Sequence, residues 1–132
     1  MIQRIQTIWL LLAAVAAFAT FYVDFYIGTN PPLKFNAKES IFVLVLNVSV
    51  AVLSLVNIFL FGNRKLQLRF AVVALILSVL SIALCFLSIK SSIAGGLALT
   101  AVAYFAIPVC LFFAVRGIWK DEKLVKSTER LR

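Results

Sequence analysis

Four apolar runs lie between Ile5 and Val115, and none of them contains a Lys, Arg, Asp, Glu or His residue. A helix needs about 20 predominantly apolar residues to cross the ~30 Å hydrocarbon core of a bilayer, and each run is close to that length. The sequence therefore predicts an all-α integral membrane protein, in which one four-transmembrane-helix bundle forms a single domain over residues 1–132. The predicted spans are residues 5–23, 41–61, 70–89 and 95–115, and a short amphipathic basic C-terminal tail covers residues 116–132.

The composition agrees with a membrane protein, because 64% of the residues are apolar and only 14% are charged. A soluble domain carries about 25% charged residues. Asn36 with Glu39 has the spacing of a capping box and predicts the start of the second helix. The turn signal Gly95-Gly96 allows the fourth span to begin at either Ile93 or Leu97.

Basic residues are distributed unequally between the two sides of the predicted bundle. Lys and Arg close to span ends resist translocation and mark the cytoplasmic side. Ten of the 13 fall on the side that holds both termini, which predicts that both termini are cytoplasmic. An alternative interpretation is a cleaved signal peptide ending at Ala17-Phe18-Ala19, but the apolar run continues past that site. The larger group is Arg4, Arg64, Lys65, Arg69, Arg116, Lys120, Lys123, Lys126, Arg130 and Arg132, and the smaller group is Lys34, Lys38 and Lys90.

Small and polar residues recur along stripes of the predicted spans. Helices in lipid pack through small residues that let their backbones approach, so we assign these positions to helix packing. The alternatives are a polar pore along the serine stripe and ligand binding by the asparagines. A buried serine, however, satisfies its hydroxyl on a backbone carbonyl of its own helix and needs no water. The packing residues are Asn47, Ser54, Asn57, Ser78, Ser81, Cys85, Ala106 and Cys110.

Dense charge occurs in two segments on the predicted cytoplasmic side, the Asn63–Arg69 loop and the tail. The tail is amphipathic when written as a helix and pairs Glu122 with Lys126. It is interpreted as a topology signal lying on lipid, as a docking segment for a cytoplasmic partner, or as a nucleic-acid contact. The acidic residues interspersed in the tail argue against binding to nucleic acid, so we expect no nucleic-acid partner. The candidate partner or lipid contacts are Arg64, Lys65, Arg69, Lys120, Lys123, Lys126 and Arg130.

The predicted spans contain no Lys, Arg, Asp, Glu or His, the residue types that most often perform catalysis. The chain contains no His, its five acidic residues lie outside the predicted spans, and its two Cys form no C-x-x-C motif. Cys85 and Cys110 also fall at different depths in antiparallel helices, so we expect no disulfide. Acid–base catalysis needs a positioned titratable group, and a metal site needs ligands at familiar spacings. We therefore predict a protein that is not an enzyme, with no catalytic residue, cofactor or metal.

Three segments on the predicted cytoplasmic side resemble the signature of one family. They are the opening Met1–Thr7, the Asn63–Arg69 segment and the closing Lys120–Arg132. Together they resemble an uncharacterised four-span membrane family of the Bacteroidota, catalogued as a domain of unknown function, and the resemblance covers the whole chain. It implies a location in the inner membrane of a Gram-negative bacterium. It supplies no activity, ligand or catalytic residue.

The sequence favours a non-catalytic inner-membrane accessory or scaffold protein that presents a basic loop and tail to a partner. Membrane lipids are expected to contact it, together with a membrane-protein or cytoplasmic protein partner. The alternative is a small oligomeric transporter or channel. Proton-coupled exchangers of similar size depend on a membrane-embedded carboxylate, which these spans lack. Only passive movement through a Ser- or Asn-lined interface would remain.

Overall fold

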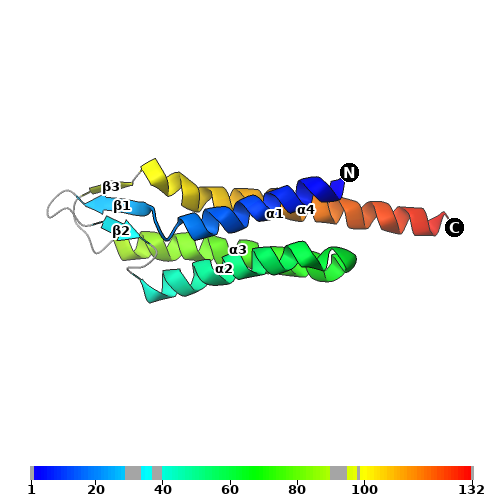
Figure 1. Ribbon diagram of the computed structural model, residues 1–132, viewed down its shortest axis with the longest axis horizontal. Coiled ribbons are helices and arrows are strands. Elements are labelled where there is room, and N and C mark those ends of the chain that lie inside the picture. Colours follow the sequence, from blue (N-terminus) through cyan, green and yellow to red (C-terminus); the bar gives the residue numbers. More distant parts are fainter. Residues whose placement is uncertain (1, 29–33, 37–39, 90–94, 98, 132) are drawn as a thin grey trace.

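The computed structural model describes residues 2–28, 34–36, 40–89, 95–97 and 99–131. Four helices run antiparallel along a common axis, and three short strands gather at one end (Figure 1). We call this end the sheet end. The opposite end, which holds the start of the first helix and the end of the last, is the termini end. The elements are α1 (Ile2–Ala19), β1 (Asp24–Gly28), β2 (Lys34–Asn36), α2 (Ile41–Phe59), η1 (Leu60–Gly62), α3 (Arg64–Ile89), β3 (Gly95–Leu97), η2 (Leu99–Ala101) and α4 (Val102–Arg130).

Each helix buries a stripe of residues at heptad spacing. The buried positions alternate steps of three and four residues, which is the pattern of left-handed helix packing. α1 and α3 each pack against both α2 and α4, so α4 closes a ring of four helices. The stripes are Gln6, Leu10, Ala13 and Ala17 in α1, continued by Thr20 just after it; Val43, Asn47, Val50, Ser54 and Asn57 in α2; Gln67, Ala71, Ala74, Ser78, Ser81 and Cys85 in α3; and Tyr104, Ile107, Leu111, Ala114, Ile118 and Asp121 in α4.

The outer faces of the bundle are covered by large apolar side chains such as Val15, Ile76 and Phe112, all more than half exposed. Three helical segments are long and apolar enough to cross a membrane: α2 with η1, α3, and α4 with η2. The apolar part of α1 is shorter, and its 18 residues extend about 27 Å at the usual helical rise. An apolar exterior of this extent suits a lipid environment.

Phe25 organises the sheet end. The strand order is β2-β1-β3, with both pairs antiparallel, and the register of β1 against β2 shifts between Asp24 and Tyr26. Phe25 is the extra residue at this bulge and is fully buried, consistent with the way bulges redirect a side chain. Its ring meets Tyr104 at 5.0 Å and Phe86 at 5.4 Å between centroids. The Tyr104 hydroxyl donates to the Thr20 carbonyl at 3.0 Å, which ties α4 to the end of α1.

The sheet was not predicted, and it corrects two expectations from the sequence. The fourth span was expected to begin at residue 95, but Gly95–Leu97 pairs with β1, and α4 begins at Val102. The capping box was expected to start the second helix, but Asn36 lies in β2 and α2 begins at Ile41, after Ser40. Glu39, the other half of that motif, lies outside the described residues.

The helix boundaries also differ from the predicted spans at both ends of the bundle. α1 ends at Ala19 rather than at residue 23. α3 begins at Arg64, so the predicted Asn63–Arg69 loop is helical from its second residue. α4 runs through Pro108 to Arg130, and the expected separate tail is therefore the last part of one 29-residue helix. Charged residues such as Arg, Lys and Glu are good helix formers, so the end of an apolar run need not end a helix.

Candidate functional site

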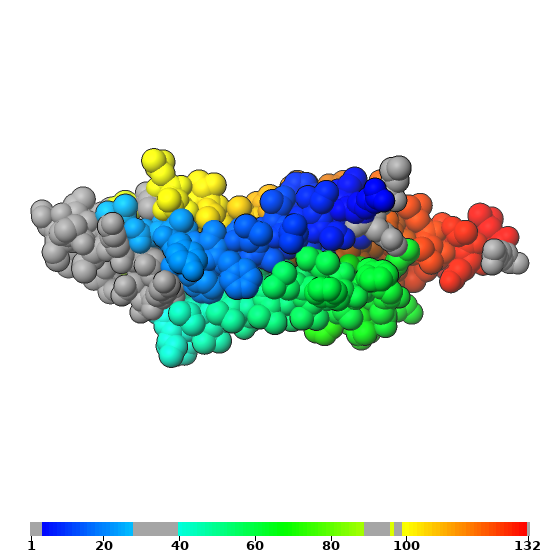
Figure 2. Space-filling view, viewed as in Figure 1, coloured from blue at the N-terminus to red at the C-terminus, as the bar shows by residue number. Residues whose placement is uncertain are grey.

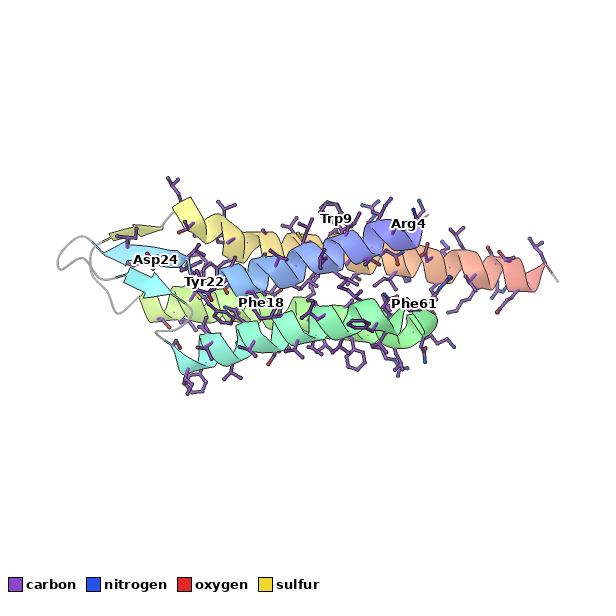
Figure 3. All side chains as sticks on the ribbon, in the orientation of Figure 1. Arg4, Trp9, Phe18, Tyr22, Asp24 and Phe61 are labelled. Atoms are coloured by element: carbon purple, nitrogen blue, oxygen red, sulfur yellow. The ribbon has the colours of Figure 1, made fainter. Side chains whose placement is uncertain are left out.

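Charged side chains gather at the termini end. Figure 3 places Arg4 of α1 and Phe61 of the α2–α3 connection at this end of the bundle. Figure 2 shows the last part of α4 projecting beyond the other helices here. Within the described residues, the larger group of basic side chains lies along the start of α1, the start of α3 and the second half of α4. The charge asymmetry of the sequence is thus an asymmetry of the folded molecule.

A buried polar pair joins α1 to α4 at this end. Asp121 is 7% exposed and Gln6 is 4% exposed, and Gln6 Nε2 donates to Asp121 Oδ2 at 2.7 Å. A carboxylate removed from water needs a hydrogen-bond donor in exchange, and this short charge-assisted bond supplies one. Gly117 leaves the space for Gln6, since a Cβ at that position would lie 2.9 Å from Gln6 Cγ. The pair attaches the extension of α4 to the start of α1.

A second polar pair joins α2 to α3 at the same end. Gln67 Nε2 donates to the backbone carbonyl of Asn57 at 3.2 Å. Asn57 is 1% exposed, and neither Nδ2 nor Oδ1 has a partner among the described residues. Buried amides of this kind are usually satisfied by ordered water. Each helix therefore ends its buried stripe with one polar residue at the termini end, namely Gln6, Asn57, Gln67 and Asp121.

The residues predicted to pack the helices lie along the interior of the bundle, and apart from Asn57 they are farther from the termini end. Seven of the eight are buried, and Ala106 is half-buried. Ser81 Oγ donates to Asn47 Oδ1 at 3.0 Å, across α3 and α2, a type of bond that contributes about 0.6 kcal/mol in membrane proteins. Ser78 donates to a carbonyl of its own helix at 2.7 Å. Asn47 Nδ2 and Ser54 Oγ have no partner within the part of the chain described. The hydrogen bonds are those of helix packing.

A groove of about 610 Å³ separates the α2–α3 connection from the projecting part of α4. We call it the charged groove. Arg64 and Lys65 line one wall, and Glu122, Lys126 and Glu129 line the other. Lys126 Nζ lies 3.1 Å from Glu122 Oε1, which is the pair expected from the sequence. Phe61 and Val125 add apolar surface, so the groove combines charge of both signs with an apolar component.

The structure divides the predicted contact residues into three sets. Arg64, Lys65 and Lys126 come together in the charged groove. Lys120 and Lys123 lie beside Trp119 on another side of α4, and the Lys123 Nζ is 6.0 Å from the centroid of the Trp119 ring. Arg69 and Arg130 are exposed and line neither of these surfaces.

The sequence analysis missed the burial of Asp121 because it treated residues 116–132 as a separate segment. The signal was present in the periodicity. Ile107, Leu111, Ala114 and Ile118 alternate steps of four and three residues, and the next step of three reaches Asp121. Extending this pattern beyond residue 115 would have placed the carboxylate in the helix interface.

Cys85 and Cys110 are both free cysteines and buried. No three His, Cys, Asp or Glu side chains come together as a group able to hold a metal ion in the ranges that the structure describes. The arrangement at the termini end is suited to binding through charge and apolar contact.

A family model described as Domain of unknown function (DUF4293) matches residues 2–131. The chain belongs to this family. The match covers nearly the whole chain and confirms the resemblance to an uncharacterised family. As a member of DUF4293, the chain receives no activity, ligand or site residue from the comparison. No curated protein and no solved structure matches it.

Proposed function

We propose that this protein is a non-catalytic scaffold of a bacterial inner membrane, which crosses the bilayer four times with both termini in the cytoplasm. In this proposal the termini end presents the charged groove to an acidic segment of a protein partner. The observation that carries the proposal is the charged groove itself, because residues from the basic start of α3 and from the projecting part of α4 line it together.

The charge distribution supports a cytoplasmic termini end. Arg and Lys close to span ends are retained on the cytoplasmic side during insertion, and the basic stretches of α1, α3 and α4 share one end of the bundle. At the usual rise, α4 extends about 43 Å over its 29 residues, which exceeds the ~30 Å core of a bilayer. The excess length lies on the cytoplasmic side in this arrangement.

The projecting part of α4 is attached to α1 at its base and also lines the charged groove. The hydrogen bond from Gln6 fixes Asp121 against α1, while Glu122 and Lys126 face the charged groove from the same turn or the next. A surface that is rigid before binding loses less conformational entropy when a partner docks. This geometry supports a docking platform in preference to a flexible tail lying on lipid.

The proposal predicts a charge-dependent cross-link. A photoreactive amino acid at Val125, which lines the charged groove, is expected to give one discrete protein adduct in cells. The Arg64→Glu/Lys65→Glu variant places like charges opposite an acidic partner, which costs several kcal/mol, so the adduct should fall at least about ten-fold. The measurement is the adduct intensity relative to the amount of full-length chain on an immunoblot.

The matched control is Arg69→Glu/Arg130→Glu, which changes the net charge equally at residues that lie outside the groove lining. It should retain more than half of the adduct. Equal losses in the two variants would show that only bulk charge matters. An undiminished adduct in the groove variant would also overturn the proposal.

The proposed topology predicts the activity of reporter fusions. Alkaline phosphatase joined after Arg132 should be inactive, because the enzyme matures only on the outer side of the inner membrane, whereas a fluorescent protein at the same place should fluoresce. Phosphatase inserted between Asn30 and Pro31 should instead be active. An active C-terminal phosphatase fusion would place the termini end outside the cytoplasm.

The transport alternative receives no support from this geometry. The heptad stripes fill the centre of the bundle with side chains such as Leu10, Val50 and Leu111. The charged groove is an outer surface, lined by exposed residues such as Phe61 and Lys65. Apolar stripe positions such as Val50 in α2 and Ala74 in α3 interrupt the polar positions along these helices.

A further inference from the structure

Two adjoining hollows on the outer side of α4 have complementary chemistry. The first, about 450 Å³, lies between α3 and α4 and is walled by Leu68, Val72, Phe112 and Val115. The second, about 470 Å³, follows on α4 toward the C-terminus and is lined by basic side chains. Arg116 and Trp119 line both hollows. An apolar surface therefore continues directly into a cationic one.

The cationic hollow has the spacing of a single helix face. Arg116, Lys120 and Lys123 are separated by steps of four and three residues, with Trp119 between them. All four side chains line this hollow. Seven residues of helix span about 10 Å, which is enough to cross the headgroup layer, about 5–8 Å deep, beside the ~30 Å hydrocarbon core. Trp119 then lies where aromatic side chains mark the membrane interface.

We propose that these two hollows form a binding site for one anionic phospholipid in the leaflet at the termini end. An acyl chain lies against the apolar walls of Val72 and Phe112, and the anionic headgroup contacts Arg116 and Lys120. The site rests on the membrane embedding of the proposed function, but it uses a different face of α4 from the charged groove.

A groove between α1 and α2 provides an internal comparison. Its volume, about 450 Å³, equals that of the apolar hollow between α3 and α4, and its apolar walls include Ile8, Ile58 and Phe59. Arg4 supplies its one cationic side chain, whereas the site on α4 has three. Each basic residue close to an anionic leaflet favours association by roughly five-fold. Charge complementarity therefore assigns the anionic lipid to the α3–α4 site.

Trp119 is an intrinsic probe for this lipid. The Trp9→Phe variant leaves Trp119 as the sole tryptophan, since the chain has two. In vesicles, phosphatidylglycerol with brominated acyl chains should quench its emission at a mole fraction about five-fold or more below that needed with brominated phosphatidylcholine. Arg116→Gln/Lys120→Gln in the same background should lower this ratio at least about three-fold, with Lys123 as the basic residue that remains in the hollow. Arg116→Lys/Lys120→Arg keeps both charges and should preserve the preference.

Arg69→Gln/Arg130→Gln removes the same charge outside the two hollows and outside the charged groove, and it should leave the ratio within about two-fold of the parent. Equal quenching of the parent by the two lipids would overturn the site. Equal loss of the phosphatidylglycerol preference in both glutamine doubles would mean that only a general attraction between basic residues and anionic lipid is measured, and would overturn the site. Loss of the preference in the charge-conserving double would contradict headgroup recognition. Displacement by millimolar inorganic phosphate would identify a free-anion site instead. Because the vesicles contain no other protein, a failure here is distinct from a failure of the scaffold proposal.

Discussion

Replacing Phe25 with alanine is expected to lower the free energy of unfolding by about 3–5 kcal/mol, the usual cost of removing a buried aromatic side chain. Phe25 is fully buried at the bulge in β1. Its ring contacts Phe86 of α3 and Tyr104 of α4, with centroid distances of 5.4 and 5.0 Å. The substitution leaves a cavity where the sheet meets two helices, so the sheet end should loosen as a unit.

The effect can be measured by chemical unfolding in mild detergent, followed by circular dichroism. Leu99→Ala is the control, because Leu99 is an apolar residue of the same end that is 95% exposed, and its truncation should cost less than about 0.5 kcal/mol. A second readout is hydrogen exchange, which should accelerate in β1 and β3 more than in the centre of α2. A Phe25→Ala protein as stable as the Leu99→Ala protein would contradict the role given to this ring.

Replacing Gln6 with leucine is expected to destabilise the protein by about 1–3 kcal/mol, because it leaves the buried Asp121 carboxylate without its donor. The bond is 2.7 Å long and joins residues 115 apart in the sequence. Asp121→Leu alone should destabilise the protein less than Gln6→Leu, because a neutral Gln6 amide left without a partner costs less than a buried carboxylate left without one. The double variant should cost less than the sum of the two single variants, because it removes both polar partners together.

The control cycle pairs Gln6→Leu with Glu129→Leu, since Glu129 is an exposed carboxylate of the same helix. That pair should be additive within about 0.5 kcal/mol. Gly117→Val gives an independent test, because its side chain would enter the space of Gln6 and should lower stability by about 1–3 kcal/mol. Additivity of Gln6 and Asp121 would mean that their hydrogen bond does not hold α4 against α1.

The apolar runs predicted the number and order of the helices, since each run lies mostly within one helix, although the first seven residues of the fourth predicted span precede α4. They predicted helix ends less well where a helix leaves the apolar region. The run starting at Ile41 coincides with the start of α2, whereas α3 starts six residues before Phe70. An apolar run reports the length of chain suited to hydrocarbon, while a helix continues wherever its backbone bonds are favourable.

The sheet could not be predicted from local pattern. β3 has three residues, two of them glycine, and lacks the apolar alternation of a half-buried strand. Its pairing with β1 joins positions about 70 residues apart, and such contacts follow from the assembled bundle. Arg64, Lys65 and Lys126 of the charged groove were among the contact residues predicted from the sequence, and their role as contacts stays a prediction, whereas Arg116 was not among them. The division of the basic residues between two faces of α4 depended on the helix remaining unbroken beyond residue 115.

The order of strands in the small sheet has a consequence for biosynthesis. β1 occupies the centre, with β2 on one side and β3 on the other. β2 follows β1 within a few residues, but β3 is synthesised only after α2 and α3. Until then the nascent chain carries an uncovered strand edge, which is a template for pairing with another chain. Arrival of Gly95–Leu97 covers that edge and joins the first helical hairpin to the second, and in the order of synthesis it precedes α4, which closes the ring of four helices.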